Sequence, residues 1–401
     1  MTMAVDATVA IDEVPTSPRG NGRPLRVALF SGNYNYVKDG CNQALNMLVD
    51  HLQRDQGAEV RVYSPTTDTP AFDPVGTLIS APAVTIPGRS EFKLAVGLSP
   101  RLRRDLEAFG PDIVHVSAPD FLGVAAQKWA GAHGVPVIAS LHTRFETYFS
   151  YYGLSLLRGW AERHLARFYG RSDYVLVPNR PILDEMSAMR RDGHVRLWGR
   201  GVDRQRFDPA RRDMAWRNGQ GIADDEIAVL FFGRLVLEKG VDDFAAIVRR
   251  LQEQGIPARP LVVGEGPAHA RLAKALPDAV FTGHLTGDDL GRAVASADVM
   301  VNPSVTEAFG NVVLESMAAG LPVVSADAPS ARALIEPENT GLLCPPADVA
   351  AYADAVRRLI ALPTEGRRLS MAARAATAAF TWSAALAAVV AVYAEAVGQV
   401  V

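Results

Sequence analysis

The chain is poor in cysteine and carries no large excess of charge. Its 401 residues include two cysteines, Cys41 and Cys344, which lie far apart and have no metal-ligand spacing. A disulfide framework is therefore not indicated, and a reducing cytoplasm is the expected compartment. The formal net charge is −3. This charge argues against a nucleic-acid binder held by bulk basicity.

Long apolar runs are also lacking. The one candidate for a membrane span, Ala384 to Ala394, is too short to cross a bilayer and is followed by Glu395. We expect it to be a buried helix. Residues 1–23 have no hydrophobic periodicity and no basic start followed by an apolar run. This segment is expected to be a disordered tail and not a signal peptide.

At this length two domains are expected. Short apolar runs alternate with amphipathic segments, which is typical of parallel α/β architecture. The pattern occupies residues 24–199, is lost near Gly199 to Gly221, and restarts within residues 200–380. Residues 381–401 are expected to form a last helix that crosses back to the first domain. The predicted strands are Leu25–Phe30, Val60–Tyr63, Asp112–Val116, Pro136–His142 and Tyr174–Pro178 in the first half, and Ala228–Gly233, Arg259–Gly264, Ala279–Gly283, Asp298–Ser304 and Pro322–Ala326 in the second.

The restart predicts two doubly wound, Rossmann-like domains that face each other across a central cleft. In open α/β sheets, ligands bind beyond the carboxyl ends of the strands, often at helix N-termini. Each of the polar motifs described below follows a predicted strand directly. A single cleft could therefore gather all of them.

Two glutamates, Glu307 and Glu315, bound the segment EAFGNVVLE, which follows a predicted strand. One lies before the predicted helix and the other on it, so both are able to face one ligand. Two carboxylates beside an anion site fit a ligand with hydroxyl groups, such as a sugar and a ribose. The alternative is a solvated loop carboxylate and an ordinary charge on a helix surface.

The residues between these glutamates predict a helix start. Asn311 is expected to cap a helix that runs to about Ala319, with Gly320 just beyond its end. The backbone amides of Gly310, Asn311 and Val312 would then lie at the positive end of the helix dipole. Such an end is a ready anion-binding site.

The segment FFGRLVLEKG, Phe231 to Gly240, places Arg234 and Lys239 in one short loop after a predicted strand. Arginine offers a planar fork to phosphate oxygens, and lysine adds a compact charge. Together they could neutralise a diphosphate as its charge develops. The alternative is a surface arginine and a pair formed by Glu238 and Lys239 that caps a helix.

Two candidate residues lie after strands of the first half. His142 is at a strand end that faces the expected cleft, where a lone histidine is more often structural than functional. Gly40 permits close backbone approach in the loop after the first strand. Asn42, close behind it, could cap the helix that follows.

EAFGNVVLE has the form E-x7-E and is followed by SMAAGLPVV. It resembles the signature of retaining glycosyltransferases of family 4, which have the GT-B fold. GRLVLEKG is similar to the G-R-x-x-x-x-K-G segment of this family. The resemblance implies that Glu307 contacts the donor sugar, that Glu315 holds the ribose hydroxyls, and that Arg234 and Lys239 bind the donor diphosphate. The remaining donor-binding residues implied in this segment are Phe309, Gly310, Asn311 and Val312.

Weaker matches extend the resemblance. FTGHL, with His284 and Leu285, resembles the family segment whose backbone meets the nucleobase. A functional histidine follows the corresponding strand in the family and contacts the donor sugar, which implies a catalytic role for His142 without making it a general base. Many family members carry a Gly-Gly pair where this chain has Gly40 and Cys41, so only one glycine is kept.

The resemblance implies a retaining transferase that moves a hexosyl-type sugar from a nucleotide diphosphate sugar to an acceptor hydroxyl. It also implies that no cofactor and no metal take part, and no Asp-x-Asp pair lies near the predicted phosphate site. Transfer to a polysaccharide or another soluble acceptor is one alternative. A nucleotide-sugar epimerase of the same fold is another.

The segment Arg144 to Arg171 interleaves aromatic residues with arginines. Its T-x-F-x-x-Y-x-x-Y arrangement is similar to family members that glycosylate glycerolipids, including mannosyl- and sulfoquinovosyl-transferases. A lipid acceptor and an anionic membrane surface are therefore expected partners, with the protein peripheral on the inner face of the plasma membrane. A core-facing amphipathic helix with a solvated face explains the pattern equally well.

Overall fold

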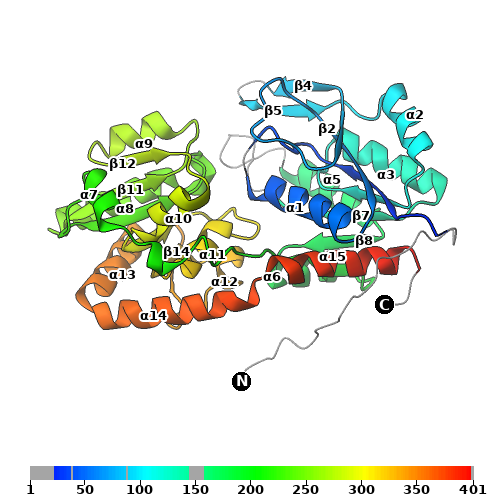
Figure 1. Ribbon diagram of the computed structural model, residues 1–401. Coiled ribbons are helices and arrows are strands. Elements are labelled where there is room, and N and C mark those ends of the chain that lie inside the picture. The colour runs from blue at the N-terminus through cyan, green and yellow to red at the C-terminus, as the bar shows by residue number, and fades with distance from the viewer. Residues whose placement is uncertain (1–21, 38, 87–88, 144–157, 399–401) are drawn as a thin grey trace.

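The computed structural model describes residues 22–37, 39–86, 89–143 and 158–398. Two α/β domains lie side by side, each built on a parallel sheet with helices packed around it (Figure 1). Most of the predicted tail lies outside the described residues. Arg23, the last residue assigned to it, is folded onto the first domain, where its guanidinium donates to both oxygens of Asp112 at 2.9 and 2.7 Å.

The first sheet has seven parallel strands in the order β3-β2-β1-β6-β7-β8-β9. Its central strands are continuous apolar runs because helices cover them on both faces. The strands are β1 (Arg26–Phe30), β2 (Glu59–Ser64), β3 (Thr77–Ser80), β6 (Ile113–Val116), β7 (Val137–Ser140), β8 (Tyr174–Val177) and β9 (Val195–Leu197), beside the antiparallel pair β4 (Ala83–Ile86) and β5 (Arg89–Ala95). The helices are α1 (Gly40–Arg54), α2 (Pro100–Phe109), α3 (Phe121–His133), α5 (Arg158–Gly170) and α6 (Arg180–Arg190).

The second sheet has six parallel strands in the order β12-β11-β10-β13-β14-β15. They are β10 (Ile227–Phe232), β11 (Ala258–Val263), β12 (Val280–Gly283), β13 (Val299–Asn302), β14 (Val323–Ala326) and β15 (Leu342–Cys344). The helices are α7 (Met214–Gly219), α8 (Val241–Glu253), α9 (His269–Ala275), α10 (Gly287–Ala295), α11 (Asn311–Ala318), α12 (Pro329–Arg332), α13 (Val349–Ala361) and α14 (Pro363–Ala376), with the short 3-10 helices η2 (Pro209–Arg211), η3 (Leu237–Lys239) and η4 (Thr377–Ala379).

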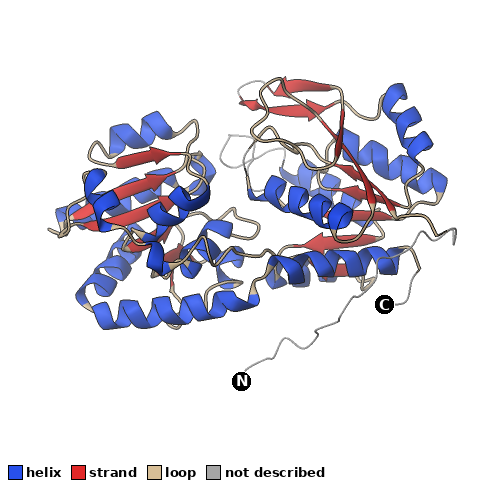
Figure 2. Cartoon of the chain, viewed as in Figure 1, coloured by secondary structure: helices blue, strands red, loops and turns tan. Residues whose placement is uncertain are grey.

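This architecture confirms the predicted pair of doubly wound domains. Figure 2 shows the strands of each sheet running through the middle of its domain with helices around them. Each predicted strand coincides with an observed one. The sequence missed β3, β4, β5, β9 and β15. Four of these strands have only three or four residues, β3 has no buried residue, and β5 is longer but mixes charged and apolar residues, so none presents a long apolar run.

The chain passes between the domains twice, and the two passages are in contact. The amide of Val202 donates to the carbonyl of Phe380 at 3.0 Å. A Cβ on Gly201 would lie 2.2 Å from the backbone nitrogen of Trp382, so a side chain has no room there. The two connecting segments therefore support each other at the base of the cleft.

After the second passage, α15 (Trp382–Ala396) returns to the first domain, where it lies below the sheet in red in Figure 1. Val389 and Tyr393 are fully buried in the same hydrophobic cluster as Leu29 of β1. The helical stretch Pro363–Ala396 is long and apolar enough to cross a membrane by length and composition. The apolar side chains of α15 are instead largely used in this core, as the sequence predicted for a buried helix.

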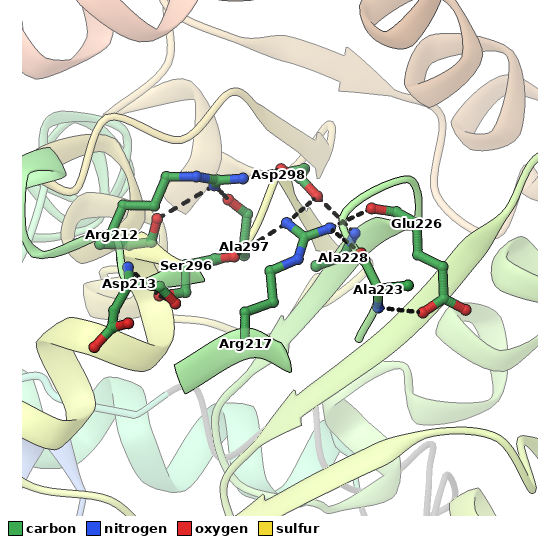
Figure 3. A network of polar contacts seen from close by, with 10 residues as sticks. Arg212, Asp213, Arg217, Ala223, Glu226, Ala228, Ser296, Ala297 and Asp298 are labelled. Atoms are coloured by element: carbon green, nitrogen blue, oxygen red, sulfur yellow. Dashed lines mark hydrogen bonds and ion pairs between the residues drawn. The ribbon is translucent and has the colours of Figure 1, made fainter. Parts of the chain in front are cut away.

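A polar network anchors the connecting segment to the second domain (Figure 3). The guanidinium groups of Arg212 and Arg217 donate to the two oxygens of Asp298 at 2.6 and 2.7 Å. The same carboxylate accepts the amide of Ala228 at 2.8 Å, and Arg217 also donates to the carbonyl of Glu226. Arg217 is buried, so this pairing offsets the cost of taking its charge out of water.

Candidate functional site

A cleft of about 1430 Å³ separates the carboxyl ends of the two sheets. It lies where the strand order reverses in each domain, at β1/β6 and β10/β13, which is the usual ligand position in such sheets. The structure brings all the predicted catalytic and donor-binding residues to this one cleft: Gly40, His142, Arg234, Lys239, His284, Leu285, Glu307, Phe309, Gly310, Asn311, Val312 and Glu315.

The start of α11 differs from the prediction by one residue. Gly310 is the N-cap, with φ 95°, and Asn311 is the first helical residue and not the cap. The left-handed conformation at this turn favours glycine, which has no Cβ to clash. Gly320 follows the helix end with φ 73°, as predicted. Gly310, Asn311 and Val312 all line the cleft, so a helix start still lies where the anion site was predicted.

The loop that carries Glu307 is tied to the loop that carries Lys239. The ammonium of Lys239 forms an ion pair with the Glu307 carboxylate. Beneath them, the hydroxyl of Thr306 donates to the carbonyl of Glu238 at 3.0 Å. Both charged side chains are mostly shielded from solvent, which strengthens their attraction. A cation and a carboxylate are thus held together at the cleft wall.

Glu315 projects from α11 into the same cleft. Burial raises the pKa of its carboxyl from 4.5 to about 8, and the positive charge of Arg206 partly opposes this shift. The carboxyl group is therefore mainly protonated at neutral pH before a ligand binds. Hydroxyl groups that donate to it would favour the charged form and lower its pKa.

His142 follows β7 and has protein partners at both ring nitrogens. Its Nε2 lies 2.8 Å from the Ser140 hydroxyl, and its Nδ1 lies 2.7 Å from Nη2 of Arg200. The ring also packs edge-on against Trp198, with centroids 5.0 Å apart. Burial, helped by the Arg200 charge, holds the pKa of His142 well below its usual range. The imidazole is therefore neutral.

The start of α1 corrects a second capping prediction. Asp39 caps the helix, accepting the amide of Asn42 at 2.8 Å, whereas Asn42 itself is buried and donates to the carbonyl of Val37 at 2.7 Å. Burial raises the pKa of the Asp39 carboxyl, while the charges of Arg234 and Lys239 act to lower it. Asp39 thus brings a first-domain carboxylate close to the two second-domain cations.

Gly40 provides the close approach of the domains. A Cβ at this position would lie 2.2 Å from Nδ2 of Asn311. A larger residue here would have to displace the Asn311 side chain, whereas the backbone conformation at Gly40 does not itself call for glycine. The start of α1 in one domain and the start of α11 in the other therefore lie against each other across the cleft.

Sequence reasoning missed three residues that shape this wall: Asp39, Asn179 and Arg200. Asp39 directly precedes the glycine that was noted. Arg200 stands between two glycines in a segment that was interpreted only as a domain boundary. The one sequence feature that could have identified Arg200 is its position after Trp198 and Gly199, directly behind the short strand β9. Asn179 follows β8 and caps α6, which is a sufficient structural role by itself.

Comparison with known proteins assigns both halves of the chain. The family description "Glycosyltransferase Family 4" matches residues 39–206, and "Glycosyl transferases group 1" matches residues 226–361. The chain is 36% identical over 372 residues to a GDP-mannose-dependent alpha-mannosyltransferase of Mycolicibacterium smegmatis, covering 89% of this chain and 94% of that protein. The chain belongs to glycosyltransferase family 4.

Other relatives and solved structures agree. The glycosyltransferase is 32% identical to a sulfoquinovosyl transferase of Arabidopsis thaliana, covering 94% of this chain and 74% of the relative. Its fold matches sucrose-phosphate synthase of Thermosynechococcus elongatus with a TM-score of 0.70, 21% identity and coverage of 92% and 98% of the two chains. It also matches HepE of Anabaena in complex with UDP and glucose, with a TM-score of 0.71, 18% identity and coverage of 91% and 98%. The fold is GT-B, and the enzyme moves a sugar from a nucleotide sugar to an acceptor.

Proposed function

We propose that this glycosyltransferase transfers a hexosyl sugar from a nucleoside diphosphate sugar to a hydroxyl group of a membrane lipid or glycolipid, with retention at the anomeric carbon and without a metal. The donor site comprises Glu307 at the sugar, Glu315 at the ribose, and Arg234 with Lys239 at the diphosphate. His142 completes the site from the first domain.

The observation that carries this proposal is the Lys239–Glu307 ion pair beside the start of α11. A helix N-terminus binds phosphate oxygens, and the neighbouring lysine adds a full positive charge. The paired carboxylate lies where the group attached to that phosphate would be. The chain itself thus supplies the positive charge needed by a departing diphosphate.

The proposed reaction is a retaining transfer. The bond between the anomeric carbon and the diphosphate oxygen breaks through an oxocarbenium-like state, and the bond to the acceptor oxygen forms on the same face. The departing phosphate oxygen is then the group beside the acceptor hydroxyl and takes its proton. The helix end and the two cations stabilise the charge that develops on the leaving group.

The surface of α5 supports a lipid acceptor. Trp160 is 59% exposed, and Arg163 and Arg167 are exposed on the same helix, whereas Phe168 and Tyr169 are buried in the core. The exposed side chains suit the proposed membrane surface, whereas the buried ones fit the interpretation of a core-facing amphipathic helix. The preceding residues 144–157, which carry most of that pattern, lie outside the described residues.

A second aromatic side chain lies at the neighbouring helix start. Phe121, the first residue of α3, is 62% exposed. His164 of α5 stacks on Trp160, and its Nε2 contacts the carbonyl of Pro119, two residues before Phe121. Exposed aromatic residues beside arginines suit an anionic membrane surface. We accordingly place the enzyme at the cytoplasmic face of such a membrane.

Relatives supply the first substrates to test. Proteins similar to this chain are named for GDP-mannose, for sulfoquinovosyl transfer and, in Acholeplasma laidlawii, as an alpha-monoglucosyldiacylglycerol synthase. Radiolabelled GDP-, UDP- and CDP-sugars, with GDP-mannose first, would be incubated with the enzyme and a lipid extract. Label in the lipid phase is expected. Transfer only to soluble acceptors would overturn the lipid acceptor, and sugar conversion without any acceptor would indicate an epimerase.

Two further measurements address the mechanism. Product NMR is expected to show the anomeric configuration of the donor, and inversion would overturn the retaining assignment. Activity is expected to survive treatment with a chelator. Loss of activity that added Mg²⁺ or Mn²⁺ restores would overturn the metal-free assignment.

A further inference from the structure

Arg200 is a buried cation at the junction of the two domains. It is 5% exposed, and its guanidinium lies over the Trp198 ring of the first domain and the Phe309 ring of the second, 5.1 and 6.0 Å from their centroids. No ion pair to a carboxylate is formed by it within the described part of the chain. Burying an unpaired charge costs free energy of folding, which indicates that Arg200 is kept at this position for a function.

The hydrogen bonds of Arg200 fix its orientation. Nη1 donates to the carbonyls of Trp198 and Gly199 at 2.9 and 2.8 Å, and Nη2 lies 2.7 Å from Nδ1 of His142. These bonds anchor the guanidinium to the backbone of the first domain. One of its nitrogens is thereby aimed at the imidazole ring.

The chemistry of arginine determines the direction of the bond to His142. A guanidinium has only N–H donors, so Nδ1 must be the acceptor. The neutral ring then carries its proton on Nε2, which donates to the Ser140 hydroxyl at 2.8 Å. Ser140 is itself held by His115, whose Nε2 lies 2.8 Å from the same hydroxyl.

The chain of contacts continues into the last helix. Nδ1 of His115 lies 2.6 Å from the hydroxyl of Tyr393 on α15, and Ser140, His115 and Tyr393 are all buried. Burial lowers the pKa of His115 to about 3, so this ring also stays neutral. Among these five hydrogen-bonded side chains at the base of the site, the two histidines are therefore neutral and Arg200 is the only cation.

We propose that Arg200 is a positioning residue that locks His142 in the neutral tautomer with the proton on Nε2. Neither ring nitrogen then has a free lone pair, so His142 acts as an oriented neutral group and not as a proton acceptor. Arg200 also lies over the Phe309 ring. The residue that fixes the His142 tautomer is therefore at the point where the donor-binding loop of the second domain meets the first domain. The catalytic part of this inference rests on the proposed function, whereas the tautomer itself does not.

The test compares two variants that each remove one partner of His142. Long-range ¹H–¹⁵N spectra of the full-length protein at neutral pH, with the His142 signals assigned by loss in His142→Gln, distinguish the two tautomers. The wild type and Ser140→Ala are expected to show the Nε2–H pattern, because Arg200 remains. Arg200→Met is expected to show the Nδ1–H tautomer or a mixture. Arg200→Lys, another donor-only cation, is expected to restore the wild-type pattern.

Kinetics provide the second readout. Arg200→Met should lower kcat by on the order of tenfold to a hundredfold, the loss expected from misplacing a catalytic group by about 1 Å. The KM for the donor should change little, because the diphosphate site is intact. Arg180→Met is the matched control, since Arg180 is an exposed arginine on α6 that pairs with Asp184.

Each outcome decides the proposal. An Nδ1–H or doubly protonated His142 in the wild type overturns it, as does an unchanged Nε2–H pattern in Arg200→Met. If Arg200→Met does not fold, the wild-type and Ser140→Ala spectra decide in its place. The spectra need no substrate, so a wrong donor or acceptor assignment would leave the tautomer result intact.

Discussion

The side-chain amide of Asn179 donates to the carbonyl of Ala308 at 2.6 Å, forming a buried hydrogen bond between the two domains. Its Oδ1 accepts the amide of Ile182 at 3.0 Å and so caps α6, which leaves Nδ2 for the second bond. Ala308 packs into the core cluster of the first domain and directly follows Glu307. One first-domain side chain thus holds the loop of a proposed catalytic carboxylate.

We predict that this bond can be removed without removing the cap. Asn179→Asp keeps an acceptor for the helix amide but turns a carboxylate oxygen toward the Ala308 carbonyl, at a cost of about 1–3 kcal/mol for the lost buried bond. kcat should fall about tenfold or more with a smaller change in donor KM. Asn179→Ser, which can still cap but is too short to reach Ala308, should lower kcat in the same direction. Wild-type kcat in both variants would contradict a role for the bond.

Substitutions of Glu307 and Glu315 should affect different steps of the reaction. Glu307→Gln removes the charge beside Lys239 and should abolish turnover while leaving donor binding measurable by calorimetry. Glu315→Gln should mainly weaken donor binding, by about tenfold to a hundredfold for one lost charge-assisted bond of about 1.5–3 kcal/mol. Full activity in both variants would contradict the assignment of these two residues to the donor site. Glu253→Gln, an exposed position on α8, is the control.

Donor affinity should depend on the ionisation of Glu315. The pKa of this carboxyl is about 8 in the free protein, and ribose hydroxyls would bind its charged form. Affinity should therefore rise with pH up to about 8, and donor binding at pH 7 should release protons. Calorimetry in buffers of different ionisation enthalpy measures this release. Glu315→Gln should remove both effects, and proton uptake on binding would contradict the assignment.

The same group should affect the stability of the ligand-free protein. A carboxyl pKa that is raised on folding, from 4.5 to about 8, favours the protonated folded state. Its contribution to the free energy of unfolding is complete below the lower value and is lost as pH rises through the higher one. Glu315→Gln should flatten this part of the pH profile of Tm. An equal slope in wild type and variant would show that Glu315 titrates normally.

The contact between Gly40 and Asn311 should be a steric limit on the approach of the domains. Gly40→Ala adds a methyl group 2.2 Å from the Asn311 amide, so the Asn311 side chain must leave its place at the start of α11 or the two helix starts must move apart. kcat should fall about tenfold or more, as for other displacements of about 1 Å. Asn311→Ala makes room, so the double variant should recover activity relative to Gly40→Ala. Strictly additive losses would show that this contact does not limit the reaction.

Much of the donor site could be predicted because its parts are local in sequence. Arg234 and Lys239 share one loop, and Glu307 and Glu315 flank one helix start, so spacing alone relates them. The strands were found because parallel strands covered on both faces are continuous apolar runs. The two capping errors, at Asn42 and Asn311, were also local. Asp39 caps α1 in place of Asn42, and Gly310 caps α11 in place of Asn311. The backbone conformation that makes each of them the cap cannot be deduced from residue type alone.

By itself the sequence predicted the two doubly wound domains and several of the residues that line one cleft, because periodicity and loop motifs are short-range properties. Only the tertiary structure decided which residues far apart in sequence contact one another. The Lys239–Glu307 pair, the Asn179–Ala308 bond and the Arg200–His142 contact each join residues 58 or more positions apart. The first depends on the fold of the second domain alone, the second on how the two domains pack, and the third on burial that selects the protonation state of His142. None of these is encoded in the spacing of neighbouring residues.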